Sequence, residues 1–181
     1  AAPGGISPGD ASPRPGAGET AATGPTASPA PEPPAPGSAA ALFGRLRSLA
    51  GKWRGRSTKG WDETVTLRSI AGGSVVVMSS FDAHPGEEMI TTFFMDADEL
   101  QLRHYCIAGN QPHLAATAIS PDGARAAFTF RDATNLPSRD SGHMDSVVYD
   151  FADPDHFTSR WTWYQSGRES FMEEIHYTRL P

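Results

Sequence analysis

The stretch "DHFTSRWTWYQSGRESFMEEIHYTRL", residues 155–180, decides the fold class. In its first half Phe157, Trp161 and Trp163 alternate with polar residues, and Ser159 falls on the same face. A period of two is typical of a β-strand with one buried face. Gly167 separates this run from a second alternating run at hairpin distance. The stretch therefore predicts two antiparallel strands joined by a tight turn.

The same alternation extends back through the chain to residue 52. Glycine or proline interrupts it repeatedly, as in "AGGS" at 71–74 and "SPDGA" at 120–124, where tight reversals are expected. The predicted strands are 52–58, 62–70, 74–82, 87–96, 99–107, 113–120, 124–131, 143–151, 156–165 and 168–179. Short serial strands favour a meander, and closing it removes exposed edges. We predict an all-β, closed antiparallel up-and-down β-barrel of about ten strands.

One helix is predicted before the strands. In "AAALFGRLRSLA", residues 39–50, Leu42, Leu46 and Leu49 recur at spacings of four and three, and Gly51 follows. This is the pattern of a short amphipathic helix, which we expect to cap one end of the barrel. The rival architecture, an open α+β roll, needs a long helix over one face of the sheet, and no other segment offers one.

The chain divides into two parts of different composition. Residues 1–40 hold 10 of the 16 prolines and contain Ile6 as their one large apolar side chain. Such a segment buries too little apolar surface to offset the entropy of ordering, so we predict a disordered Pro/Ala-rich tether. A proline-motif ligand for a partner domain is the alternative. Residues 41–181 are long enough for one barrel domain.

Charge and hydropathy exclude some classes of function. The formal net charge of −6 argues against nucleic-acid binding, which needs a basic surface. No apolar run approaches membrane-spanning length. A start at Ala1 followed by a tether predicts an exported protein, periplasmic or secreted, with a cytoplasmic location as the alternative. The single cysteine is compatible with both.

Two short motifs resemble a known superfamily. The segment "GKWRGRS" after the helix resembles the Gly-x-Trp signature of lipocalins and related calycins. That resemblance implies that Arg179, in "HYTRLP", stacks on Trp53 at the closed end of the barrel.

Residues 45–179 are also similar to an uncharacterised group of bacterial lipocalin-like proteins with "HYC…NQP", "TNL…HM" and "DHF…WTW" segments. Members of that group often have a second histidine where this chain has Asp145. The group has no established activity, so the resemblance implies a fold rather than a function.

Strand alternation assigns side chains to the barrel interior. The last strand places Phe171, Glu173, Ile175, Tyr177 and Arg179 on one face. Aromatic walls with a few polar groups are typical of a small-molecule pocket, although a filled core with mutually satisfied polar groups is the alternative. The candidate ligand-binding residues are His104, Cys106, Phe128, Phe130, His143, Trp161, Trp163, Glu173 and Tyr177.

We therefore predict non-covalent binding of a small, largely apolar or aromatic molecule, with His104, Tyr177 and Glu173 orienting its polar end. One alternative is an enzyme using His104 as a base, or a haem protein using His104 or His143 as an axial ligand. Another is a protein-interaction module with a filled barrel. No metal site is expected, since His104 and His113 are nine residues apart without further ligands. Oligomeric state is left open.

The roles of the remaining polar segments have structural as well as functional interpretations. Cys106 near His104 resembles a nucleophile–base pair, but we favour the interpretation that Cys106 is a buried, inert cysteine. The turn "GNQP", 109–112, either stabilises the backbone or places Asn110 and Gln111 at the barrel mouth. If the loop "ATNLPSRDSG", 133–142, is a lid, Asn135 and His143 beside it line the same mouth. In "HPGEEM", residues 84–89, the two adjacent glutamates alternate to opposite faces, and we expect ordinary turn charges.

Overall fold

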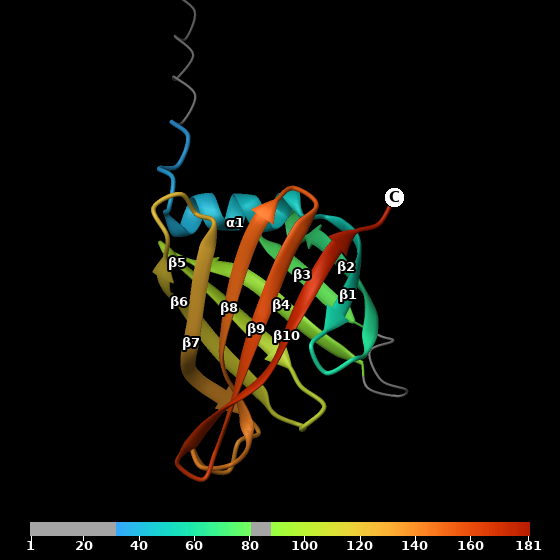
Figure 1. The fold of residues 1–181 in the computed structure, drawn as a ribbon. Helices are drawn as coiled ribbons and strands as arrows, with labels where there is room; N and C mark the ends of the chain where they lie inside the picture. Colours follow the sequence, from blue (N-terminus) through green and yellow to red (C-terminus); the bar gives the residue numbers. More distant parts are fainter. Residues whose placement is uncertain (1–31, 81–87) are drawn as a thin grey trace, which may run out of the picture. The chain divides into compact units, whose positions relative to one another are not determined.

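Ten strands form one closed antiparallel barrel in which each strand pairs with its neighbours in sequence (Figure 1). The strands are β1 (Gly51–Ser57), β2 (Asp62–Ile70), β3 (Val75–Ser80), β4 (Met89–Asp96), β5 (Glu99–Tyr105), β6 (Gln111–Ile119), β7 (Arg125–Thr134), β8 (His143–Asp153), β9 (His156–Gln165) and β10 (Arg168–Arg179). The barrel closes where β1 pairs with β10, with Trp53 opposite Arg179. The predicted fold class is confirmed.

This computed structural model describes residues 32–80 and 88–181. Most of the predicted tether, residues 1–31, lies outside the described residues, as do 81–87, which include the ends of two predicted strands and most of "HPGEEM". Residues 33–181 form one compact unit, which is treated by itself below.

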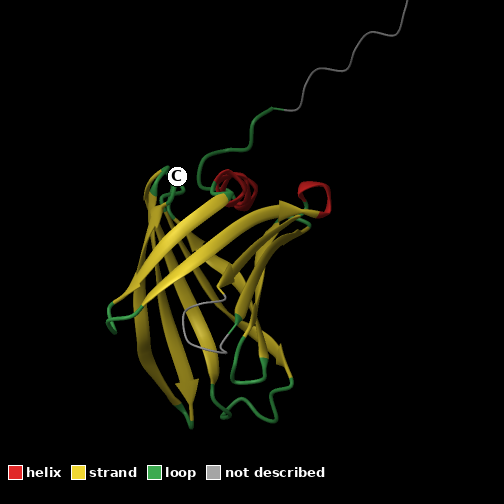
Figure 2. Cartoon of the chain, turned by 90° about the vertical axis from the view of Figure 1, so that its right-hand side faces the viewer, coloured by secondary structure: helices red, strands yellow, loops and turns green. Residues whose placement is uncertain are grey.

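Helix α1 (Ala39–Ser48) lies across one end of the barrel (Figure 2). The Ser38 side chain caps it by accepting a hydrogen bond from the Ala41 N–H at 3.1 Å. Leu42, Leu46 and Leu49 are almost fully buried against the barrel interior. The predicted capping helix is therefore present. Among the described residues, no helix has the length and apolarity that crossing a membrane requires.

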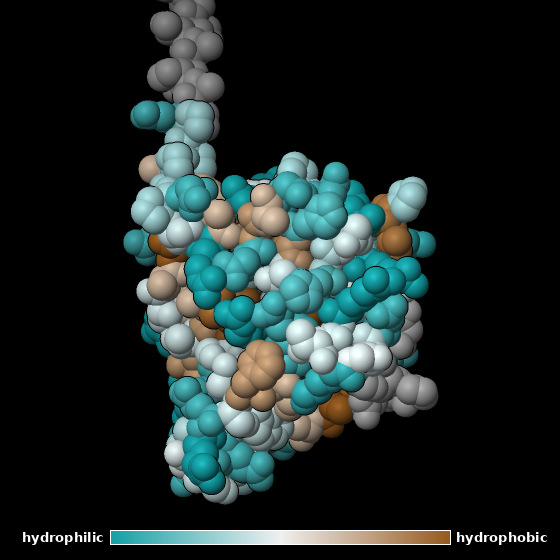
Figure 3. Space-filling view, viewed as in Figure 1, coloured by the Kyte–Doolittle hydropathy of each residue, from teal (hydrophilic) through white to brown (hydrophobic). Residues whose placement is uncertain are grey.

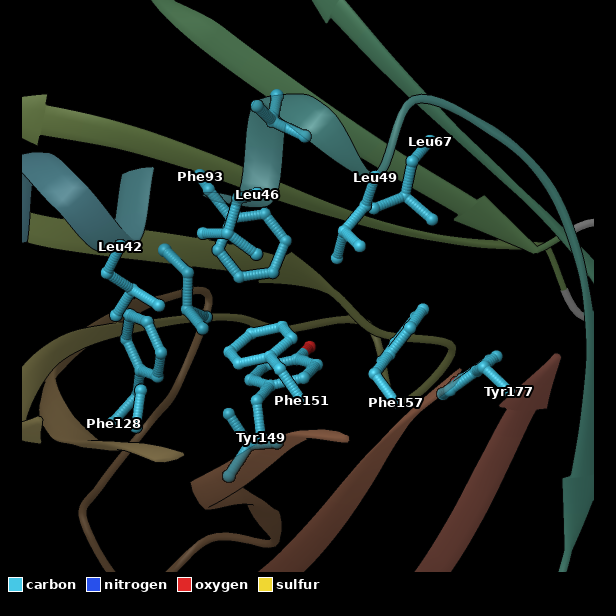
Figure 4. Close-up of a cluster of buried hydrophobic side chains, with 14 of the residues drawn as sticks. Leu42, Leu46, Leu49, Leu67, Phe93, Phe128, Tyr149, Phe151, Phe157 and Tyr177 are labelled. Atoms are coloured by element: carbon cyan, nitrogen blue, oxygen red, sulfur yellow. The ribbon is translucent and has the colours of Figure 1, made fainter. Parts of the chain in front are cut away.

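The half of the barrel beneath α1 is filled by packed side chains. Figure 4 shows leucines of the helix facing an aromatic layer. Tyr149 meets Phe93 and Phe128 edge to face, with ring centroids 5.7 and 6.1 Å apart, and Phe157 stacks on Tyr177 at 4.4 Å. Each such buried side chain contributes about 1.5–3 kcal/mol through burial alone. This layer forms the floor of the remaining interior space.

The predicted pair at the base of the barrel is also present. The Arg179 guanidinium lies 4.2 Å from the ring centroid of Trp53, which is fully buried and donates from Nε1 to the Leu49 carbonyl at 2.8 Å. Arg179 also donates to the carbonyls of Ala50 at 3.0 Å and Pro154 at 2.8 Å. The pair therefore joins the first strand, the last strand, the end of α1 and the β8–β9 turn.

One assignment of the last strand is wrong. Phe171 was expected on the inward face with Glu173, but it is 60% exposed. A β-bulge between Phe171 and Glu173 inserts an extra residue, so the alternation changes phase at that point. Met172 occupies the inward position instead and lines a pocket.

The outer face of the barrel is largely polar. Figure 3 shows mainly hydrophilic residues on the face viewed in Figure 1, interrupted by isolated apolar patches. Ion pairs such as Arg125–Asp150 and Arg160–Glu174 join neighbouring strands there. Exposed pairs of this kind contribute little to stability.

Candidate functional site

Two adjoining cavities occupy the half of the barrel away from α1. The deeper one, here called the inner chamber, has a cavity volume of about 50 Å³. The other, here called the outer pocket, has a volume of about 390 Å³ and includes the exposed residues Lys59 and Ile107 at its rim. Their shared lining residues are Trp61, Met89, Met144 and Glu173.

The inner chamber combines aromatic, thioether and acidic side chains from seven strands and the turn before β2. Its described lining residues are Trp61, Glu63, Met78, Ser80, Met89, Thr91, His104, Met144, Trp161, Glu173, Ile175 and Tyr177. The outer pocket is more apolar. Its described lining residues are Lys59, Trp61, Met89, Cys106, Ile107, Ala108, Met144, Trp163, Met172 and Glu173.

Glu63 is a buried carboxylate at the floor of the inner chamber. The hydroxyl of Ser80 donates to its Oε2 atom, and the Tyr177 hydroxyl donates to its Oε1 atom at 2.9 Å. Burial, and secondly the charge of Glu63, raise the pKa of Tyr177 well above its ordinary value. The phenol therefore stays protonated at neutral pH and remains a donor to the carboxylate.

Gly55 makes this contact possible. It pairs with Glu63 on one side and with Tyr177 on the other, so the two side chains meet across β1. A Cβ atom at residue 55 would lie 2.8 Å from the Glu63 Cγ atom and 2.8 Å from the Tyr177 Cε1 atom. Only glycine leaves room for both side chains at this position.

His104 faces the inner chamber from β5 and is 6% exposed. Its Nδ1 atom lies 2.9 Å from the Thr91 hydroxyl, and its ring lies 4.9 Å from the Trp161 ring. Burial lowers the pKa of His104 to about 4, so the imidazole is neutral at pH 7. Its buried Nε2 atom has no hydrogen-bond partner among the described residues.

Glu173 lies at the boundary between the two cavities. Its Oε2 atom accepts a hydrogen bond from the Ser57 hydroxyl at 2.7 Å. At the rim, the Lys59 ammonium contacts the Met172 sulfur at 3.3 Å. A ligand entering through the outer pocket therefore passes a rim lysine before it reaches the two carboxylates.

Cys106 lines the outer pocket just beyond the end of β5. Burial raises the pKa of its thiol, with smaller opposing effects from backbone hydrogen bonds. The thiol therefore stays protonated at neutral pH, which is the opposite of an activated nucleophile. Its neighbour His104 faces the inner chamber, so the structure does not pair the two residues as nucleophile and base.

Six of the nine candidate ligand-binding residues line one of the two cavities: His104, Cys106, Trp161, Trp163, Glu173 and Tyr177. Phe128 lies instead in the packed aromatic layer under α1. Phe130 and His143 line neither cavity. Their rings contact each other at a tilt of 49°, with ring centroids 4.7 Å apart.

A bulge explains the position of His143. The register of β8 against β9 shifts between Met144 and Ser146, and Met144 rather than His143 lines the cavities. His143 pairs with Tyr164 and is fully buried beneath the segment 135–142. Strand alternation read without this bulge places the histidine on the wrong face.

The segment 135–142 is fastened to the barrel by Arg139. The Arg139 guanidinium lies 3.8 Å from the Tyr164 ring centroid and 4.5 Å from that of Phe130. It also donates to the Asp145 carboxylate at 2.5 Å and contacts Nε2 of His143. This cluster has a structural role rather than the character of a ligand site, since its polar atoms form hydrogen bonds and ion pairs with one another.

The "GNQP" turn has a structural role in this arrangement. The Asn110 side chain is buried and donates to the Gly142 carbonyl at 2.9 Å, while Asn135 donates to the Gly109 carbonyl. The Gln111 side chain accepts from the Thr134 hydroxyl at 2.5 Å. These bonds join the 106–110 turn to the 135–142 segment, so none of the three polar side chains is directed at the cavities.

The described histidines are not brought together in a metal site. His113 lies on the outer face, where it contacts Gln101 and Asp132, whereas His104 lies inside. Across residues 32–80 and 88–181, no three His, Cys, Asp or Glu side chains are grouped closely enough to hold a metal ion. A porphyrin ligated by His104 would need an open slot along its Nε2 atom. The chamber that His104 faces has a volume of about 50 Å³, which is too small for a porphyrin, and the Trp161 ring lies 4.9 Å from the imidazole.

Several lining residues were not predicted, although alternation marks some of them. Glu63 is in phase with the buried Val65 and Leu67, and Thr91 is in phase with Phe93. Trp61 precedes β2 in a turn, where no periodic signal applies. Comparison with known proteins adds no further residue, since no protein-family model and no curated protein matches the chain.

Proposed function

We propose that this barrel binds a small molecule non-covalently, with an apolar or aromatic body in the outer pocket and a polar end in the inner chamber. One observation carries the proposal: an apolar pocket of about 390 Å³ adjoins a small chamber of buried polar groups. Ligand sites are typically of this size and pair apolar walls with a few orienting polar groups.

Each of the two cavities contributes a different part of the binding free energy. Burying about 200 Å² of apolar ligand surface contributes about 5 kcal/mol. Micromolar affinity needs about 8 kcal/mol. The polar end must supply the remainder, which gives a role to the hydrogen-bonding groups of the inner chamber.

We also propose that the chain is a lipocalin-like calycin. The closed barrel, the capping helix and the Trp53–Arg179 pair support this assignment. Lipocalins in the narrow sense have eight strands. The ten strands here therefore favour a relative within the wider calycin group, in which the interior has room for a ligand.

An enzyme using His104 as a general base is less well supported. An efficient base has a pKa near the working pH. The pKa of His104, about 4, leaves it a weak base. A haem protein predicts a Soret band after haem titration, and that band is the result that would revive this alternative.

The test is a titration with N-phenyl-1-naphthylamine, an uncharged aromatic probe whose fluorescence rises in apolar surroundings. Ala108→Trp places an indole in the outer pocket, and Ala118→Trp, at an exposed position on β6, is the matched control. We expect the wild type and Ala118→Trp to bind the probe and Ala108→Trp to lose at least tenfold in affinity. Equal binding by all three proteins, or no binding by any, would overturn the proposal and favour a filled interaction module.

A further inference from the structure

The inner chamber has the chemistry of a receptor for a positively charged nitrogen. The relevant groups are two carboxylates, one neutral imidazole and three aromatic rings, and this inference rests on the proposed function. We propose that the ligand is an amine that is protonated at neutral pH, with its ammonium group in the inner chamber and its apolar body in the outer pocket.

The charge of the chamber favours a cation. Its twelve described lining residues include Glu63 and Glu173 but no lysine or arginine. Glu63 is 6% exposed and accepts hydrogen bonds from the hydroxyls of Ser80 and Tyr177. A ligand carboxylate placed here would meet two like charges and is disfavoured.

His104 is a second and independent indication of a ligand. The side chain is more than nine-tenths buried, lines the chamber and has an Nε2 atom without a partner among the described residues. An N–H donor from a ligand would select the tautomer in which the Nδ1–H donates to Thr91, 2.9 Å away. The Nε2 lone pair would then accept the hydrogen bond.

The walls of the chamber also suit an ammonium group. Trp61, Trp161 and Tyr177 present aromatic rings, which attract cations through their quadrupoles. A chamber of about 50 Å³ holds a small head group but not the body of a ligand, since one water needs roughly 10–15 Å³ by the same measure. The adjoining apolar pocket then receives the body.

Lys59 and the outer pocket set the direction of binding. Lys59 is a rim residue of the outer pocket, and its ammonium contacts the Met172 sulfur. Lys59 lines the outer pocket and not the chamber, so its positive charge does not occupy the place proposed for the ligand cation. Glu173 lines both cavities and marks where the head group of the ligand ends and the body begins.

Three isosteric probes test the inference by calorimetric titration: 1-naphthylmethylamine, 1-naphthalenemethanol and 1-naphthoic acid. We expect the amine to bind about tenfold more tightly than the alcohol, and the acid to bind more weakly than the alcohol. Glu173→Gln, and separately Glu63→Gln, should bring the affinity for the amine to within about threefold of the affinity for the alcohol measured in the same variant.

Circular dichroism of each variant identifies a protein that fails to fold. If Glu63→Gln fails to fold, Glu173→Gln still tests the inference, because residue 173 is less buried. If the three probes bind with equal affinity and Ala108→Trp weakens all of them, the cation inference is wrong while the proposed function stands. If no probe binds the wild type, the proposed function fails and the inference with it.

Discussion

The Tyr177 hydroxyl reaches across β1 and donates a hydrogen bond to Glu63 Oε1 at 2.9 Å. The two residues are 114 positions apart and lie on the last and second strands. They meet because the strand between them carries glycine at residue 55. Barrel closure thus places a protonated phenol and a carboxylate together at the floor of the inner chamber.

We expect Gly55→Ala to separate Tyr177 from Glu63. The added Cβ atom would overlap both side chains, and overpacking of this kind destabilises a protein by about 1–3 kcal/mol. Gly44→Ala is the matched control, because nothing lies within 4 Å of its Cβ position and the helix gains about 0.5–1 kcal/mol. Urea unfolding measures both changes, and equal effects of the two variants would contradict this account.

His104 should make the protein less stable in acid. Its folded pKa of about 4 lies below the ordinary 6.5, so below pH 6.5 the unfolded chain takes up a proton that the folded chain does not. Stability from this group is complete above pH 6.5 and falls by up to about 3 kcal/mol as the pH drops to 4. His104→Gln should remove this part of the slope in urea unfolding from pH 4 to 7.5. An unchanged slope would show that the histidine titrates normally.

Arg179→Ala should destabilise the barrel by about 2–3 kcal/mol, because it removes the cation–π contact with Trp53 and the hydrogen bonds to the backbone carbonyls of Ala50 and Pro154. Arg179→Lys should recover only a minor part, since an ammonium cannot reproduce the planar contacts of guanidinium. Arg168→Ala, at an exposed position on the same strand, should stay within about 0.5 kcal/mol. Thermal unfolding compares the three, and a neutral Arg179→Ala would remove the structural role of the pair.

Arg139→Ala should loosen the segment 135–142 without changing ligand affinity. The variant loses ring contacts with Tyr164 and Phe130 and leaves Asp145 without its ion pair, at about 1–3 kcal/mol. Hydrogen exchange should quicken at 135–142. A parallel titration with N-phenyl-1-naphthylamine should be unaffected, and weaker binding would instead identify this segment as a lid over the cavities.

The fold could be predicted from the sequence because alternation, turn residues and the helical leucines all indicate one architecture. The prediction of the barrel-base pair came from the resemblance, and the contact of Arg179 with Trp53 confirms it. Alternation also placed His104, Trp161 and Tyr177 on the inward face, and all three line the inner chamber. The period of two determines on which face of the sheet each side chain lies, wherever the pairing of the strands is regular.

Prediction failed where the ladder is irregular. Bulges near Met172 and Asp145 change the phase within a strand, which exposes Phe171 and turns His143 away from the cavity. A bulge is set by pairing with the next strand, so a single strand's sequence does not reveal it. Phe128 was correctly predicted to face inward. The sequence does not show, however, that Phe128 lies in the half of the barrel that is filled by the side chains packed under α1.

The methionines provide the most direct test of ligand binding inside the barrel. Met78, Met89, Met144 and Met172 line the cavities, whereas Met95 packs against the core and lines neither. In a titration of methyl-¹³C-methionine protein with 1-naphthalenemethanol, followed by NMR, we predict the largest shifts at Met89 and Met144, which line both cavities, and none at Met95. Unmoved methionine signals, or shifts of equal size that include Met95, would contradict a ligand site within this barrel.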